Sequence, residues 1–457
     1  MTRGTGPVKD KKNASTAEER LKEALVPKEE QPYELPGNWA WTTLRLLVES
    51  VKDSTLDFSE LNDKYVGLEH MQKDGGELLF GGASEIKSLK NRFSSGNILY
   101  GKLRPYLNKH GIASFDGICS TDILVFQTRS CADANFVNYF FNTTWFMDYA
   151  VSYSKGINLP RVSESTVLNA QCPLPPLAEQ KRIVERIEGL FSKLDEAKEL
   201  IQSSLERSQL RRSAILHAAF TGQLTEQWRK ENNVSQETWQ KKTLGAFCDS
   251  FQYGTSKKSQ NSGRIAVIRM GNLQQGEISW DNLAFTDDDE DIDKYLLRKG
   301  DVLFNRTNSP ELVGKTSIYR GEQPAIFAGY LIRINYGHEL TGEFLNYLLN
   351  SMSARDYCNA VKTDGVNQSN INAQKLAAFP CSIPSLPEQH EIVRILDSLL
   401  QKEDAARELC EGVLEKIELT RKSILAQAFR GHLGTNNPND PSALDLLEKV
   451  FRDSSTV

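Results

Sequence analysis

The sequence has no closely spaced cysteine pairs. Its seven cysteines are scattered over 457 residues, and none belongs to a Cys-x-x-Cys pair. An odd, dispersed set is not typical of a disulfide framework or a zinc site. We therefore expect reduced, buried thiols in a cytosolic protein.

Long apolar runs are also missing. No run approaches the roughly 18 residues that a membrane span needs, and the polar N-terminus has no apolar signal core. These features predict a cytoplasmic chain with no membrane partner.

Recognisable catalytic motifs are absent. The six histidines include no His-Glu-x-x-His pair, and the sequence has no Gly-x-Ser-x-Gly elbow and no Asn/Asp-Pro-Pro-Tyr loop. Residues 309–316 resemble a phosphate-binding loop, but Ser309 replaces its first glycine and Pro310 follows. This segment leads into an expected strand, not a helix, so we do not expect nucleotide binding there. The sequence predicts no catalytic and no metal-ligating residues.

One long segment is present twice. Residues 175–224 align with residues 384–433 without a gap, at a constant offset of 209, and 22 of the 50 positions are identical. Upstream the matches continue with a drifting offset, as at Trp39 against Trp239. A fixed length is typical of a long helix, because one inserted residue rotates its apolar stripe by about 100°. The pattern predicts two repeats, each a globular unit followed by a long helix.

Apolar residues in the repeated segments recur at alternating steps of four and three, which is typical of a coiled-coil seam. The expected seams are Ile183, Ile187, Leu190, Leu194, Ala197 and Ile201 in the first helix, and Ile392, Leu396, Leu399, Glu403, Ala406, Cys410, Val413 and Ile417 in the second. A helix from Ala178 to Phe220 would be about 65 Å long. We expect the two helices to pair with each other, antiparallel if a pseudo-twofold relates the repeats.

Glu179 and Gln180 are expected to satisfy free N–H groups in the first helical turn. Gly222 and Gly431 follow the expected ends of the two helices as stop signals.

The segments between the helices are β-rich. Expected strands include residues 97–100, 123–126, 265–268, 301–304 and 330–334, and a helix is expected over residues 135–149. The predicted fold class is α+β, with two repeated α/β domains separated by two long helices that form an antiparallel coiled coil. The predicted segments are an N-terminal arm (1–33), a first domain (34–177), a central helix (178–233), a second domain (234–386), a C-terminal helix (387–433) and a tail (434–457).

The two ends of the chain carry weaker signals. Residues 15–18 resemble a capping box that opens a short helix through Leu25. We expect this charged arm to be mobile alone and to become ordered on a partner. Residues 442–447 of the tail are expected to form a helix.

Charge is unevenly distributed. The net charge of −5 does not by itself indicate nucleic-acid binding, yet six bases and no acid lie between Lys87 and His110. Residues 287–291 form an acidic run, which we interpret as a solvated loop or a surface that repels DNA.

Basic and amide side chains gather in loops that follow expected strands. Arginine can read guanine, asparagine and glutamine can read adenine, and lysine mainly holds phosphate. The candidate DNA-binding residues of the first domain are Lys102, Arg104, Tyr106, Lys109, Lys155, Asn158 and Arg161. Those of the second domain are Tyr253, Lys257, Arg306, Asn308, Lys315, Lys362, Asn367 and Gln368. The alternative is that these are ordinary solvated turn residues.

These features together resemble the specificity subunits of type I restriction–modification systems. The resemblance rests on two Pro-x-Leu-x-Glu-Gln helix starts (175–180 and 384–389) and on matched helix ends (213–224 and 422–433). It covers about residues 34–433. It implies two target-recognition domains, each reading one half of a bipartite, asymmetric site in double-stranded DNA, and a coiled coil that sets a fixed spacer.

The resemblance also implies partners. Two DNA adenine methyltransferase subunits would dock on the chain, and translocating restriction subunits would join the complete enzyme. S-adenosylmethionine, ATP and Mg²⁺ would bind to those subunits, so this chain would hold no cofactor and would not itself be an enzyme. We hypothesise that the arm and the tail contact the methyltransferase subunits.

Two alternatives stay open. The first is a DNA-modifying enzyme with an unrecognised active site, and the second is a coiled-coil scaffold that does not read DNA. The scaffold does not explain why the globular halves diverge in sequence while the long helices do not.

Overall fold

The chain folds into two compact units. The computed structural model describes residues 17–56, 64–82, 88–366 and 368–453. Unit 1 comprises residues 1–200 and 413–457, and unit 2 comprises residues 201–412. Two long helices, α6 (Leu177–Phe220) and α12 (Leu386–Ala428), each contribute to both units. The domain boundaries given above stay predictions, because this division cuts both helices.

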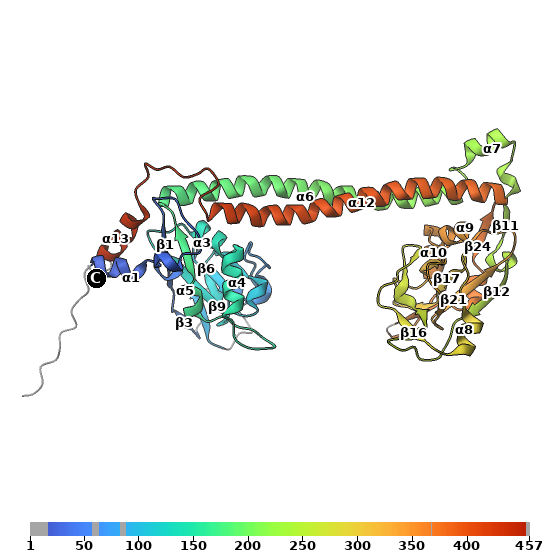
Figure 1. The fold of residues 1–457 in the computed structure, drawn as a ribbon, viewed down its shortest axis with the longest axis horizontal. Helices are drawn as coiled ribbons and strands as arrows, with labels where there is room; N and C mark the ends of the chain where they lie inside the picture. Colours follow the sequence, from blue (N-terminus) through green and yellow to red (C-terminus); the bar gives the residue numbers. More distant parts are fainter. Residues whose placement is uncertain (1–16, 57–63, 83–87, 367, 454–457) are drawn as a thin grey trace, which may run out of the picture. The chain divides into compact units, whose positions relative to one another are not determined.

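Unit 1 is built around two four-stranded sheets, in the orders β2-β9-β6-β7 and β3-β5-β8-β4, and a two-stranded ribbon, β1-β10 (Figure 1). Its strands are β1 (Ala40–Thr43), β2 (Val48–Ser50), β3 (Ser54–Thr55), β4 (Tyr65–Val66), β5 (Lys90–Phe93), β6 (Ile98–Gly101), β7 (His110–Ile112), β8 (Gly117–Cys119), β9 (Ile123–Thr128) and β10 (Gln171–Leu174). Its shorter helices are α1 (Ala17–Ala24), η1 (Lys28–Glu30), α2 (Leu44–Leu47), η2 (Leu68–His70), η3 (Pro105–Leu107), α3 (Ala134–Phe141), α4 (Thr144–Ser152), α5 (Glu164–Leu168) and α13 (Ala443–Asp453).

Unit 2 contains the sheets β12-β21-β17-β19, β16-β13-β20 and β18-β23-β22 and the ribbons β11-β24 and β14-β15. Its strands are β11 (Gln240–Thr243), β12 (Cys248–Tyr253), β13 (Ile265–Ile268), β14 (Leu273–Gln274), β15 (Glu277–Ile278), β16 (Ala284–Thr286), β17 (Val302–Asn305), β18 (Thr307–Asn308), β19 (Thr316–Ile318), β20 (Ala325–Phe327), β21 (Leu331–Tyr336), β22 (Thr363–Asp364), β23 (Ser369–Asn370) and β24 (Pro380–Ile383). Its shorter helices are α7 (Glu226–Asn232), η4 (Gln236–Thr238), η5 (Leu244–Phe247), η6 (Met270–Asn272), α8 (Asp289–Tyr295), α9 (Gly342–Leu349), α10 (Met352–Val361) and α11 (Ala373–Ala377).

The two units repeat one topology. The sheet β2-β9-β6-β7 of unit 1 has the same order and antiparallel pairing as β12-β21-β17-β19 of unit 2. The ribbons also share one register, since Trp41 lies opposite Pro173 in β1-β10 and Lys241 lies opposite Ser382 in β11-β24. The duplication and the α+β class predicted from the sequence are confirmed, and the five expected strands are found with their ends shifted by at most two residues.

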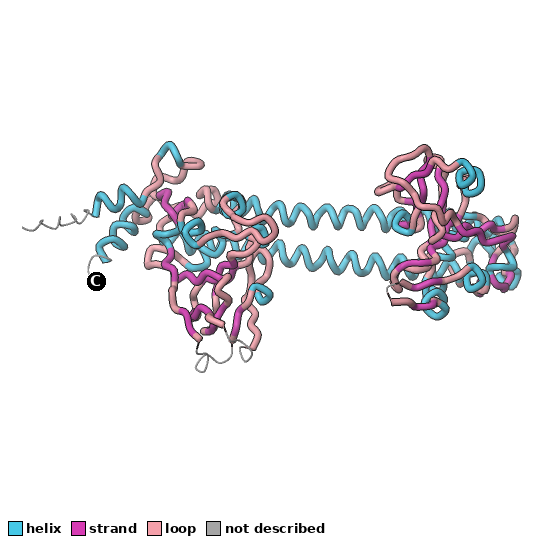
Figure 2. The backbone as a smooth tube through the Cα atoms, turned by 90° about the horizontal axis from the view of Figure 1, so that it is seen from below, coloured by secondary structure: helices cyan, strands magenta, loops and turns pink. Residues whose placement is uncertain are grey.

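The long helices lie side by side within each unit (Figure 2). In unit 1, Lys198 of α6 donates to Glu418 of α12 at 3.0 Å, and Asp195 pairs with Arg421. In unit 2, Arg211 of α6 donates to Glu403 of α12 at 2.8 and 3.0 Å. Residue numbers rise along α6 as they fall along α12, which confirms the predicted antiparallel pairing.

Part of the predicted seam is wrong. Ile183, Ile187, Ile392 and Leu396 are fully buried as expected, and the positive φ of Gly222 and Gly431 confirms both stop signals. However, Ala406 and Val413 are exposed, and the half-buried positions there are Arg407 and Leu414. Glu403, Cys410 and Ile417 of the predicted seam are half-buried or buried, so only its alternate positions are displaced by one residue.

Each long helix begins with a fully buried glutamate and glutamine. Glu179 accepts the indole N–H of Trp39 at 2.8 Å, and Glu388 accepts that of Trp239 at 2.9 Å. The side chain of Gln180 bonds the backbone of Asp133, Cys131 and Pro175, and that of Gln389 bonds the backbone of Thr341, Glu339 and Pro384. The predicted capping role is wrong, because these bonds go to the globular domain and the segments around the helix start and not to N–H groups of the first helical turn.

The helix expected over residues 135–149 is two helices. Helix α3 ends at Phe141, and α4 starts at Thr144 after the N-cap residue Thr143, whose hydroxyl accepts the N–H of Phe146 at 3.2 Å. A threonine cap competes with helix continuation, and the apolar periodicity alone did not reveal it.

The expectation of a mobile arm is wrong for residues 21–33. Helix α1 packs against α13, whose position confirms the predicted tail helix. Val26 is buried, and its N–H donates to the carbonyl oxygen of Trp41 at 3.0 Å. Ser15 and Thr16 of the expected capping box lie outside the described residues.

All seven cysteines are free thiols. Five are buried, and Cys248 and Cys410 are partly exposed. Burial raises the pKa of the Cys119 thiol to about 12, which makes it a poor nucleophile. Among the helices of the described residues, none is long and apolar enough to cross a membrane.

The buried glutamates yield a prediction about stability. Glu388 also accepts bonds from Arg229 at 2.6 Å and from Thr225 at 2.7 Å, whereas Glu179 is bonded by the neutral groups of Asn436 and Thr435. Glu388→Gln leaves the buried Arg229 without its counter-charge and is expected to cost about 3–5 kcal/mol. Glu179→Gln is expected to cost less, about 1–3 kcal/mol. Urea unfolding followed by hydrogen exchange in each unit measures both, and equal losses would contradict this account.

Candidate nucleic-acid interface

The two candidate loops of unit 1 lie side by side. One follows β6 and contains residues 102–109, and the other contains residues 155–161. The N–H of Arg104 donates to Pro160 O at 2.7 Å, and the N–H of Val162 donates to Lys102 O at 3.0 Å. Lys155 and Arg161 close the second loop through two backbone hydrogen bonds of 2.9 and 2.8 Å. Sequence positions more than fifty residues apart thus form one surface.

Most candidate side chains of unit 1 reach solvent. Those of Arg104, Tyr106, Lys155, Asn158 and Arg161 are exposed, and those of Lys102 and Lys109 are half-buried. Arg104 has a φ of 50°, in the left-handed region, which turns the backbone before η3. Lys109 donates to Leu68 O at 2.6 Å, and Arg161 pairs with Asp122 at 2.9 Å. Arg104 and Lys155 therefore offer positive charge that no described acid neutralises.

Unit 2 joins the equivalent loops in the same way. Strand β18, directly after Arg306, pairs with β23, and β23 pairs with β22. The N–H of Ile371 donates to Arg306 O at 2.9 Å, and the amide of Asn370 donates to the Thr307 hydroxyl at 2.7 Å. These contacts bring residues 306–308 together with residues 369–371 and, through β23, with residues 363–364.

Arg306 is held in place by an aromatic ring. Its guanidinium lies 4.8 Å from the ring centroid of Tyr253, a cation–π distance. The hydroxyl of Tyr253 accepts the N–H of Ala373 at 3.0 Å, which anchors the ring at the start of α11. The Nε atom of Arg306 is buried and finds no hydrogen-bond partner among the described residues. Nη1 of Arg306 donates to Gly329 O at 3.5 Å, so the ring and this bond hold one face of the half-buried guanidinium on the protein.

The remaining candidate side chains of unit 2 differ in their exposure to solvent and in their hydrogen bonds. Gln368 is exposed, and Asn308 is half-buried in β18. Lys315 donates to Gln274 at 3.2 Å, and Lys362 donates to Pro310 O at 3.0 Å. Asn367 lies outside the described residues.

Lys257 is surrounded by acids. Its ammonium lies 2.8 Å from Asp288, 3.4 Å from Glu290 and 3.6 Å from Asp291. The hydrogen bond that Lys257 donates to Asp288 raises the pKa of Lys257. The acidic run is not a solvated loop as expected, because Asp288 caps α8 and the next three acids form its first turn, where they stabilise the helix dipole. The positive charge of Lys257 is therefore compensated.

Two loop-tip residues were missed by the sequence reasoning. Ile157 and Val366 occupy matching positions at the offset of 209, and both side chains are fully exposed. An apolar residue between polar neighbours carries no periodic signal, so only the comparison of the repeats could have singled them out.

The segment resembling a phosphate-binding loop ends in a strand. Residues 309–314 form a turn, and β19 follows, so no helix N-terminus faces a phosphate there. Within the described residues, no cluster of His, Cys, Asp and Glu could hold a metal ion.

Comparison with known proteins identifies the family. The family model described as "Type I restriction modification DNA specificity domain" matches residues 84–207 and 236–418, one match in each repeat and about two thirds of the chain. The chain belongs to this specificity family. The resemblance predicted from the helix starts and ends is confirmed.

Named relatives and solved structures agree with this assignment. The specificity chain is 27% identical over 351 residues to the type I restriction enzyme EcoKI specificity subunit of Escherichia coli K12, with 74% of each chain covered. It is 34% identical over 206 residues to the EcoDI specificity subunit of Escherichia coli, covering 43% of this chain and 45% of the relative. The crystal structure of the HsdS subunit from Thermoanaerobacter tengcongensis shares the fold, with 21% identity, a TM-score of 0.54 and coverage of 88% and 99%.

A further structure is described as the basis of complex assembly and conformational transition of the type I R–M system. One of its chains matches with a TM-score of 0.69 and 21% identity, covering 88% of the specificity chain and all of that chain. These similarities confirm the predicted fold.

The Tyr253–Arg306 contact yields a prediction for the specificity chain. Tyr253→Ala removes the ring beneath the guanidinium, and we expect DNA affinity to fall by about 0.5–2 kcal/mol because Arg306 loses its fixed orientation. Tyr253→Phe keeps the ring and is expected to keep most of the affinity. Fluorescence anisotropy with a labelled duplex measures both, and equal losses in the two variants would contradict the role of the ring.

Proposed function

We propose that this chain reads a bipartite, asymmetric DNA site for a type I restriction–modification enzyme, one half-site for each unit. One observation carries the proposal: both units bring the same two loops together after equivalent central strands, β6 and β17, yet the side chains differ. Unit 1 presents Arg104 and Lys155, whereas unit 2 presents Arg306 and Gln368. Two different half-sites require different hydrogen-bonding side chains, and the equivalent loops of the two units carry them.

The candidate residues have different proposed roles. Arg306 and Asn308 are positioned for base edges, since both are half-buried and held by neighbours. Lys155 and Lys102 are proposed to hold phosphates, because a flexible ammonium acts mainly as a point charge. Lys257 is left out of this set, since three acids compensate its charge.

We propose that the chemistry belongs to partner subunits. The relatives are named specificity subunits of restriction enzymes, and this name supports a division of labour between reading and reaction. Methyl transfer from S-adenosylmethionine, and DNA translocation and cleavage with ATP and Mg²⁺, would then take place on methyltransferase and restriction subunits in the cytoplasm. The rival reading as a DNA-modifying enzyme predicts turnover by this chain alone.

Repeated exposed leucines support two copies of the methyltransferase partner. Leu200 and Leu409 match at the offset of 209 and are 69% and 72% exposed, and Leu210 and Leu419 also match and are 71% and 64% exposed. Unit 1 contains Leu200 and Leu419, and unit 2 contains Leu210 and Leu409, so each unit offers one leucine from each long helix. Two equivalent sets of exposed leucines are suited to two identical partners.

Methylation mapping tests the proposed function. In a host that carries this chain with its methyltransferase subunit, we expect a split adenine-methylated motif with a fixed gap. Arg306→Ala is expected to relax one half of the motif and Arg104→Ala the other, each at a cost of about 1–3 kcal/mol in binding to the intact site. Lys257→Ala is the control and should leave the motif unchanged.

A continuous motif, or loss of both halves in either arginine variant, would contradict two independent readers. Methylation by this chain alone would favour the rival enzyme. An unchanged motif in both arginine variants would favour the scaffold.

A further inference from the structure

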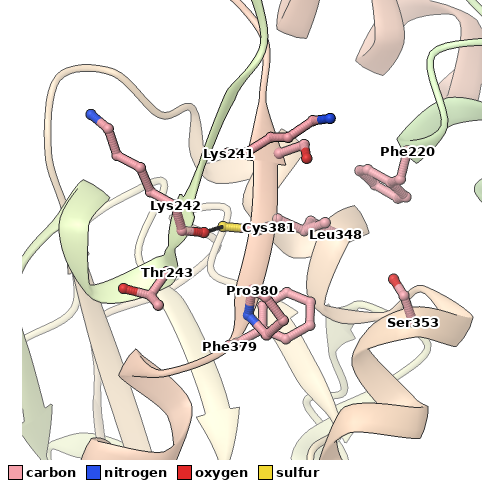
Figure 3. Close-up of a pocket in the computed structure, with 10 residues that line it drawn as sticks. Phe220, Lys241, Lys242, Thr243, Leu348, Ser353, Phe379, Pro380 and Cys381 are labelled. Carbon is pink, nitrogen blue, oxygen red and sulfur yellow. Dashed lines mark hydrogen bonds between the residues drawn. The ribbon is translucent and has the colours of Figure 1, made fainter.

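Unit 2 contains an open groove beside its two-stranded ribbon. The groove has a volume of about 510 Å³ and lies between β24, the end of α6 and the helices α9 and α10 (Figure 3). Phe220, Leu348 and Phe379 form its apolar wall, and Lys241 extends toward the side on which Phe220 lies (Figure 3). Lys241 is exposed and makes no ion pair with any described residue of unit 2.

The equivalent place in unit 1 is filled by two tryptophans. Trp41 stands where unit 2 has Lys241, because the two ribbons share one register. Trp145 stands where unit 2 has Ser353, two residues after the helix caps Thr143 and Ser351. The indole N–H of Trp145 donates to Gln171 O at 3.1 Å, which lays this ring along β10.

The chain's own N-terminal segment completes this filling in unit 1. The ring of Tyr33 packs edge-on against Trp41 with centroids 4.9 Å apart, and its hydroxyl donates to Phe429 O at 3.0 Å. Phe429 is the counterpart of Phe220 at the offset of 209. Strand β1 is buried as a result, whereas three of the four residues of β11 are exposed.

This comparison of the two units indicates which kind of side chain would bind in the groove of unit 2. In unit 1 the occupant is the segment around Tyr33, which is followed by the acid Glu34 and preceded by Glu29 and Glu30 of η1. In unit 2 the groove has room for an aromatic ring and offers the free ammonium of Lys241 to an acid. The arm of this chain is already tied to unit 1 by Val26 and Tyr33, so the occupant comes from another polypeptide.

We propose that this groove of unit 2 docks a segment of the methyltransferase subunit that carries an aromatic side chain next to acidic residues. The identity of this partner rests on the proposed function. The two partner copies would then bind differently, because the groove is open in unit 2 and its equivalent in unit 1 is filled.

The test uses the full-length chain with purified methyltransferase subunit. The double variant Lys241→Trp/Ser353→Trp places two indoles in the groove, at the positions where unit 1 has Trp41 and Trp145. We expect one of the two methyltransferase copies to bind at least tenfold more weakly, measured by mass photometry over a concentration series. Lys241→Glu, a single exposed change, should weaken the same copy in a salt-dependent way.

Lys258→Trp places an indole on another exposed position of unit 2 and serves as the matched control. It should bind both copies as the wild type does, and hydrogen exchange should show unit 2 folded in every variant. A photo-crosslinker at Ser353 should join an aromatic and acidic segment of the methyltransferase subunit.

Crosslinks to DNA or to a second copy of this chain would overturn the proposal, and so would wild-type binding by both groove variants. Those outcomes leave the proposed function intact. If the wild-type chain bound no methyltransferase subunit at all, the proposed function itself would be contradicted.

Discussion

The buried glutamate in the first turn of each long helix is the contact on which each unit depends. A buried carboxylate is tolerated only where its oxygens are fully bonded, and the bonds of Glu179 and Glu388 reach the tryptophan before the first strand of each domain. The neighbouring glutamine fixes the backbone before α3 or α9. These bonds hold together the start of the long helix, the two-stranded ribbon and the helix α3 or α9. The loops that follow β6 and β17 therefore have a defined position within their unit.

The two units satisfy the same glutamate by different routes. In unit 2 the counter-charge is Arg229 on α7, which directly follows α6. In unit 1 the bonds come from Thr435 and Asn436 of the C-terminal tail, and Arg182 of α6 holds the same tail through Thr435 O. The tail therefore supplies the bonding partners of the buried glutamate in unit 1, as the short helix α7 does in unit 2. The N-terminal arm adds a cover over β1 that β11 does not have.

The sequence was most informative where a regular element repeats. The starts of both long helices were predicted to within a residue, because apolar periodicity and the Glu-Gln starts agree, whereas the predicted segments 178–233 and 387–433 extend past the observed ends at Phe220 and Ala428. The loops at residues 102–109 and 155–161 could be named as candidates, and the matching offset suggested their counterparts in unit 2.

What the sequence could not predict depends on contacts between distant segments. The burial of Val26 and Tyr33 needs the surface of β1 and the end of α12, and an arm with three prolines carries no sign of either. The cation–π contact of Arg306 with Tyr253 joins residues more than fifty positions apart. The acids around Lys257 read as a repulsive loop because the helix that they begin was not expected.

An exchange of one reader tests the central claim most directly. Residues 34–177 would be replaced by the matching segment of a family member, and the adenine-methylated motif would be mapped in a host that carries the chimera and the methyltransferase subunit. Two independent readers predict that one half of the motif changes while the other half and the gap remain. A change in both halves, or in neither, would contradict the account.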